Sequence, residues 1–158
     1  PATGTDRARR GAAVSERWPR DPRDPATWPH LFSVAEAEAI LPEIVPLLME
    51  LRAHKVALDT AVLALQKLTP AMRQNGHAPQ SQALDEQIHD RAMELRAGVE
   101  HLADQGIEVK NLDHGLIDFP SLRDGRVVYL CWRLGEGVRL RYWHEIDAGF
   151  AGRRSLDE

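Results

Sequence analysis

Cysteine is almost absent from this chain, which has one such residue among 158. A single cysteine cannot form a disulfide within the chain, and this suits a reducing compartment such as the cytoplasm. The chain has no stretch of about 18 apolar residues, and its N-terminus lacks the apolar segment of a signal peptide. A strong charge of one sign is also missing, since the net charge is −4. We therefore expect a cytoplasmic protein that binds neither nucleic acid nor a membrane.

The length suffices for one domain with a core of ordinary size, preceded by a tail. Residues 1–29 are rich in Arg, Asp and Pro without an apolar period, which predicts a disordered or loosely docked segment. Its two tryptophans, Trp18 and Trp28, are unusual for such a segment and suggest docking on the folded body or on a neighbouring subunit. The folded domain is predicted to span residues 30–158.

Residues 33–105 are predicted to form a long helical hairpin. Ser33 to Glu36 matches a capping box, and apolar residues then recur at the helical period. Pro42 and Pro46 interrupt this pattern, so we expect either a kinked helix or two shorter ones. Residues 69–79 read as the loop, and a second helix is predicted over residues 81–105, ending at Gly106.

Beyond Gly106 the apolar period changes from 3.6 to 2, which indicates strands. Short strands are predicted at residues 107–110 and 116–119, the second ended by Pro120, and longer strands at residues 126–134 and 138–146. Residues 147–158 follow as a closing loop. The predicted fold class is therefore α+β, a long kinked helical hairpin packed against a small antiparallel β-sheet, with a mobile N-terminal tail.

The two longer strands are joined by Gly135-Glu136-Gly137, which reads as a three-residue hairpin turn. This turn pairs Leu134 with Val138 and therefore Val128 with His144. One face is then mostly apolar and should pack on the helices. The other face carries Val127, Tyr129, Cys131, Arg133, Arg139, Arg141, Trp143 and Glu145, and it suits solvent, a subunit contact or a ligand site.

Several motifs carry a resemblance to a known family. They are Phe32 to Ala37 (FSVAEA), Val109 to Asp113 (VKNLD), Gly115 to Pro120 (GLIDFP), Val128 to Glu136 (VYLCWRLGE), Trp143-His144 and Gly149 to Arg153 (GFAGR). Together they resemble the bacterial proteins grouped as domain of unknown function 2203, over residues 31–156. The resemblance implies a single domain without an established activity, and it therefore supplies no mechanism.

Polar residues of the sheet region supply three alternative chemistries. His144, Asp118 and Glu145 are candidate ligands for a divalent metal such as Zn, Fe or Mn. Adjacent strand residues point to opposite faces, so only one of His144 and Glu145 can line a given site. Cys131 beside arginines is a candidate nucleophile. Tyr129, Cys131, Arg133, Arg141, Trp143 and Arg153 form the candidate site for a small anionic ligand.

The helices offer two further possibilities. Glu86 with His89, and Glu50 with His54, partly resemble the ligand pattern of di-iron bundles, although only one full Glu-x-x-His copy exists. Helical hairpins often bury leftover apolar surface by pairing, so a homodimer is predicted. The first hypothesis for function is a protein that binds a small anionic ligand or a divalent metal at the sheet, either as an enzyme or as a binding protein. The alternative is a non-enzymatic homodimeric interaction module that uses its helical hairpin.

Overall fold

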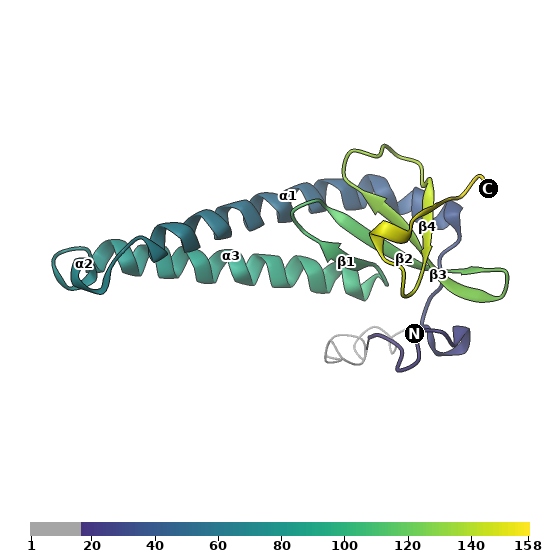
Figure 1. Ribbon diagram of the computed structural model, residues 1–158, viewed down its shortest axis with the longest axis horizontal. Helices are drawn as coiled ribbons and strands as arrows, with labels where there is room; N and C mark the ends of the chain where they lie inside the picture. The colour runs from purple at the N-terminus through teal and green to yellow at the C-terminus, as the bar shows by residue number, and fades with distance from the viewer. Residues whose placement is uncertain (1–16) are drawn as a thin grey trace, which may run out of the picture.

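The computed structural model describes residues 17–158 and shows a long helical hairpin with a β-sheet at one end (Figure 1). The helices α1 (Val34–Gln66) and α3 (Ala78–Asp104) form the hairpin, and the sheet has five antiparallel strands in the order β1-β2-β3-β4-β5. This arrangement confirms the predicted α+β class. Residues 1–16, which belong to the predicted tail, lie outside the described residues. Among residues 17–158, no helix is both long and apolar enough to cross a membrane.

Helix α1 begins at the predicted capping box. The Ser33 side chain accepts a hydrogen bond from the Glu36 backbone N–H, and the Glu36 carboxylate accepts one from the Ser33 backbone N–H. The helix then runs through Pro42 and Pro46 for 33 residues without a break. The two-helix alternative is therefore wrong. Both prolines are exposed to solvent, where water can satisfy the carbonyl groups that lose their helical partners.

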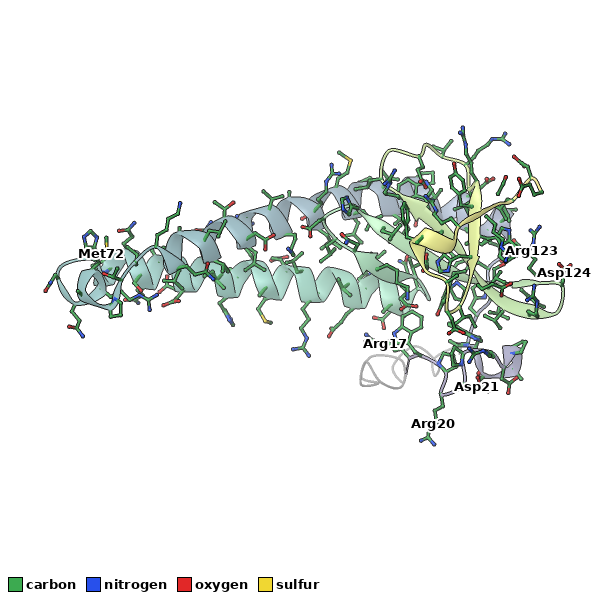
Figure 2. The ribbon with its side chains drawn as sticks, in the orientation of Figure 1. Arg17, Arg20, Asp21, Met72, Arg123 and Asp124 are labelled. Carbon is green, nitrogen blue, oxygen red and sulfur yellow. The ribbon has the colours of Figure 1, made fainter. Side chains whose placement is uncertain are left out.

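The tip of the hairpin lies far from the sheet. The connection predicted as a loop contains a short helix, α2 (Pro70–Gln74), whose first turn is capped by the Thr69 hydroxyl. Figure 2 shows Met72 at this tip, at the opposite end of the molecule from Arg123 and Asp124. The distal half of the hairpin is thus formed by α1 and α3, with α2 at its tip.

The strands are β1 (Glu108–Asn111), β2 (Leu116–Arg123), β3 (Arg126–Arg133), β4 (Tyr142–Glu145) and β5 (Arg154–Ser155). The prediction that Pro120 ends β2 is wrong, because the strand continues to Arg123. At Pro120 the backbone faces away from β3, since its carbonyl accepts a hydrogen bond from the Phe32 N–H at 2.7 Å. A proline is tolerated at an edge that offers no ladder partner for its nitrogen.

The pairing of β3 with β4 differs from the prediction by one residue. Val128 lies opposite Glu145, and Tyr129 lies opposite His144. The chain between Arg133 and Tyr142 does not form the predicted three-residue turn, because β4 begins only at Tyr142. A one-residue change of register turns every side chain of one strand to the other face. His144 therefore lies on the face that carries Cys131, and Trp143 lies on the apolar face.

Other segments of the chain pack on both faces of the sheet. The apolar face, with Val128, Leu130, Trp132 and Trp143, packs with buried side chains of α1 and α3 into the main core. The opposite face is covered in part by residues 17–29, where Trp28 is buried against Val127 and Tyr129. The indole N–H of Trp28 also donates to the Pro22 carbonyl at 2.9 Å. This described part of the predicted tail is thus docked on the folded body.

Candidate metal centre

Three neighbouring strands bring Asp118, Cys131 and His144 together. Asp118 in β2 lies opposite Cys131 in β3, and His144 in β4 lies opposite the neighbouring Tyr129. Only 1%, 1% and 2% of these three residues are exposed, respectively. A carboxylate oxygen, the thiol sulfur and an imidazole nitrogen lie within 4.8 Å of one another. The register expected from the sequence placed His144 and Cys131 on opposite faces of the sheet, so it did not predict this cluster.

Both ring nitrogens of His144 have hydrogen-bond partners. Nδ1 lies 2.8 Å from the carbonyl oxygen of Glu145, so it carries a proton and donates it. Nε2 lies 3.0 Å from Oδ2 of Asp118. Burial lowers the pKa of His144, but the hydrogen bonds to Asp118 and to the Glu145 carbonyl outweigh it, and the net pKa lies above the ordinary value. The imidazole is thus fixed with Nε2 directed at a carboxylate.

Asp118 has an unused acceptor. Its Oδ1 is buried and has no hydrogen-bond partner among the described residues. Buried carboxylate oxygens are normally paired, so an unpaired one marks a position where a proton donor, a water or an ion can bind. This oxygen lies in the same cluster as the Cys131 thiol.

Cys131 is a poor nucleophile in this setting. Burial, and then the negative charge of Asp118, raise the pKa of its thiol to about 12. The guanidinium of Arg153 acts in the opposite direction but does not compensate. Because the thiolate is the reactive form, a thiol with this pKa is inert at neutral pH. The geometry therefore favours a buried ligand or a packing role over nucleophilic catalysis.

Aromatic side chains close the cluster on one side. The Tyr129 ring lies 5.5 Å from the His144 ring, and Trp28 packs edge-on against Tyr129 at 6.1 Å. Burial, and then the carboxylate of Glu108, raise the pKa of Tyr129, so its phenol stays neutral. The N-terminal segment thus contributes to the cover over the polar face of the sheet.

Arg153 and Glu136 form an ion pair next to Cys131. Two nitrogens of Arg153 contact the two carboxylate oxygens of Glu136, each at 2.7 Å, and Nη2 also donates to the Cys131 carbonyl at 3.2 Å. Burial raises the pKa of Glu136, but the Arg153 and Arg133 N–H donors outweigh it and bring the pKa below its ordinary value. Arg153 is therefore already neutralised within the chain.

The other predicted site residues lie in different parts of the sheet region and not around one site. Glu145 lies on the opposite face from Cys131 and pairs with Arg126 at 3.0 Å. Trp143 is buried in the main core, and Arg141 is exposed in the connection before β4. The predicted anion-binding residues are thus not assembled on one surface, and anion binding stays a prediction. Of the candidate metal ligands, Asp118 and His144 lie together, and the third member of their cluster is Cys131 rather than Glu145.

The helical residues do not form a second metal cluster. Glu86 and His89 are exposed on α3. His54 Nε2 lies 3.6 Å from Glu50, while its Nδ1 accepts a hydrogen bond from Arg91 at 2.9 Å. Because the lone pair of Nδ1 accepts the hydrogen bond from Arg91, it is not available to a metal. The di-iron arrangement is therefore not favoured.

Residues 30–156 match the model of a protein family described as uncharacterized conserved protein, domain of unknown function 2203 (DUF2203). The chain belongs to this family. No curated protein and no solved structure matches the chain. The match includes all three residues of the cluster, and the docked segment with Trp18 and Trp28 precedes it. The description of the family names no activity, so the function is inferred from this chain's own geometry.

Proposed function

We propose that this DUF2203 protein binds a divalent transition metal, with Zn²⁺ as the first candidate, through Asp118, Cys131 and His144. The observation that carries the proposal is the orientation of His144. Metal-binding histidines commonly donate one ring N–H to a backbone carbonyl or carboxylate, which presents the other nitrogen to the metal. His144 has this arrangement, with Nδ1 held by the Glu145 carbonyl and Nε2 facing Asp118.

The distances fit a tetrahedral ion after a small adjustment. Bonds of about 2.0 to 2.3 Å to nitrogen, oxygen and sulfur place the donor atoms about 3.3 to 3.8 Å apart. The donor atoms of the cluster lie within 4.8 Å of one another, and His144 Nε2 and Asp118 Oδ2 are separated by 3.0 Å. Adjustments of about 1 Å in the side chains would meet the requirement. The unpaired Oδ1 of Asp118 supplies a carboxylate oxygen that needs a partner.

The donor set favours particular metals. A thiolate with an imidazole and a carboxylate suits zinc, and also iron, better than manganese or magnesium, which prefer oxygen. A bound cation would reverse the raised pKa of Cys131, because a coordinating thiol loses its proton. Since all three side chains are buried, the role that we infer is to hold β2, β3 and β4 together.

Metal content and Co²⁺ spectra test the proposal. The full chain, incubated with Zn²⁺ and passed through a desalting column, should retain about one ion per chain. Asp118→Asn, Cys131→Ser and His144→Gln should lose it, and the thiolate-to-metal absorption of the Co²⁺ form should disappear in Cys131→Ser. His54→Gln is the matched control, because it removes a half-buried histidine of the hairpin. Wild-type protein that retains no metal, or equal losses in the control, would contradict the proposal.

A second candidate function, a homodimeric interaction module, is favoured by a separate observation. The outer face of α1 exposes three large apolar side chains at regular spacing, Met49, Val56 and Leu63. Exposed apolar surface on a helix commonly marks a contact with a protein partner. Homodimer formation stays a prediction, and the surface involved can be specified further.

A further inference from the structure

The outer face of α1 carries an apolar stripe made of Met49, Val56 and Leu63. Their exposed fractions are 54%, 58% and 57%. The spacing of seven residues places them on one face of the helix, with a drift of about 20° per step. Apolar residues repeated at this interval are the pattern by which one helix packs along another. The stripe is thus a regular feature rather than a scatter of single exposed residues.

The hairpin itself does not use this face. Helix α1 contacts α3 through the opposite side, where Leu51 and Ala61 are buried and Leu58 is half-buried in the core. Figure 1 shows that the distal half of the hairpin extends away from the sheet, with only α2 at its tip. Nothing else in the described part of the chain therefore covers the stripe.

We propose that the stripe is the contact surface for a second copy of this chain, packed antiparallel along α1 and centred on Val56. Met49 and Leu63 each lie seven residues from Val56, so an antiparallel copy places Met49 of one chain opposite Leu63 of the other. Such a stripe is complementary to itself under a two-fold rotation. A symmetric interface between identical chains requires this property.

The charges beside the stripe favour the same partner and the same direction. Arg52 lies four residues before Val56, and Asp59 lies three residues after it. Asp59 contacts Lys55 of its own helix at 2.6 Å, and its side chain stays 51% exposed, so it is open to a second cation. The antiparallel two-fold arrangement brings Arg52 of each copy to within about one residue of Asp59 in the other, on the same side of the stripe. On the other side, Ala53 and Thr60 are small enough to let the two helices approach closely. The opposite charges thus meet twice, once on each side of the axis.

The proposal is independent of the metal centre, which lies in the sheet. Sedimentation equilibrium of the full chain should show a monomer–dimer equilibrium that does not change when EDTA is added. Val56→Glu should weaken the dimer at least about tenfold, because it places two like charges at the centre of the contact. Met93→Glu is the matched control, since Met93 is 53% exposed on α3 and should leave the dimer intact. A monomeric wild type, or equal effects of the two variants, would overturn the proposal.

Charge reversal distinguishes this pairing from a general apolar contact. Arg52→Asp alone and Asp59→Arg alone should each weaken the dimer about tenfold, because like charges then meet twice. The variant with both changes should recover most of the wild-type affinity. If the double variant is as weak as the single variants, Arg52 and Asp59 do not face each other.

Disulfide trapping tests the direction. Val56→Cys should form a cross-linked dimer under mild oxidation, because the two thiols meet at the axis. Leu63→Cys should not, since its copies would lie about 21 Å apart along the helices. A mixture of Leu63→Cys and Met49→Cys should give the mixed cross-link. Cys131 is buried and gives the background level in the wild type. Cross-linking of Leu63→Cys with itself would contradict the antiparallel arrangement.

Discussion

Replacing Asp118 by valine tests how much the polar cluster contributes to stability without metal. Asp118 and His144 are almost fully buried and joined by a 3.0 Å hydrogen bond. The change leaves His144 Nε2 without a partner in a low-dielectric environment. Removing one member of a buried pair costs about 3 to 5 kcal/mol, a large part of the roughly 5 to 15 kcal/mol that stabilises a typical domain. His144→Leu should cost a similar amount, because it strands the Asp118 carboxylate.

The double variant Asp118→Val with His144→Leu should be far less destabilised than the sum of the single changes. Both polar groups are then replaced by apolar ones of similar size, which is often nearly neutral. The expected coupling energy is therefore at least about 2 kcal/mol. Urea unfolding of the four proteins in EDTA, followed by tryptophan fluorescence and far-UV circular dichroism, measures it.

Two results would refute this reasoning. If the effects of the single changes add within about 0.5 kcal/mol, the two side chains do not interact as a buried pair. If Asp118→Val leaves the free energy of unfolding unchanged, the carboxylate does not satisfy His144 at all. Repeating the wild-type measurement with Zn²⁺ separates the metal contribution, which should be absent from all three variants.

Three further predictions concern the same fold. Because the pKa of His144 is raised in the folded state, its protonation stabilises the fold fully below the ordinary value of 6.5, and this stability is lost as pH rises through the folded-state pKa. Urea titrations in EDTA should therefore show that wild type loses stability relative to His144→Gln as the solution becomes alkaline. Trp28→Ala should lower the free energy of unfolding by about 3 kcal/mol, because it removes the packing on Tyr129, and limited proteolysis should then cut sooner within residues 17–29. A Cβ on Gly98 would overlap the buried side chain of Leu51, so Gly98→Ala should destabilise the hairpin by about 1 to 2 kcal/mol in thermal unfolding despite its better helix propensity.

The helical hairpin could be predicted because its signals are local. The capping box at Ser33 depends on two residues three positions apart, and the apolar period of α1 depends on one turn after another. Of the two alternatives expected at Pro42 and Pro46, a kink or a break, the break does not occur. In the structure, the core contacts of Leu41, Ile44 and Leu48 hold the helix together across both prolines. Tertiary packing thus overrides a local preference, and one sequence alone does not reveal how strongly.

The extent of β2 depended on a long-range contact. Pro120 reads as a strand end because it lacks an N–H, yet the chain remains extended to Arg123. The Phe32 N–H bonds to the Pro120 carbonyl, and the Ser121 hydroxyl donates to the Phe32 carbonyl at 2.6 Å. A segment about 90 residues earlier therefore occupies this edge of the strand. Neither the sequence around Phe32 nor the sequence around Pro120 indicates that the two segments pair.

The candidate site depended on register, which is the least local property of a sheet. A short turn at Gly135 predicts that Val128 opposes His144, whereas the longer connection shifts β4 by one residue. The shift moves Trp143 into the core and His144 beside Cys131. The hydrophobic pattern contained a usable signal, because Trp143 is the most apolar residue of β4 and belongs on the face that packs against helices. A register chosen to bury Trp143, rather than to fit the shortest turn, brings His144, Cys131 and Asp118 onto one face and predicts this buried cluster directly.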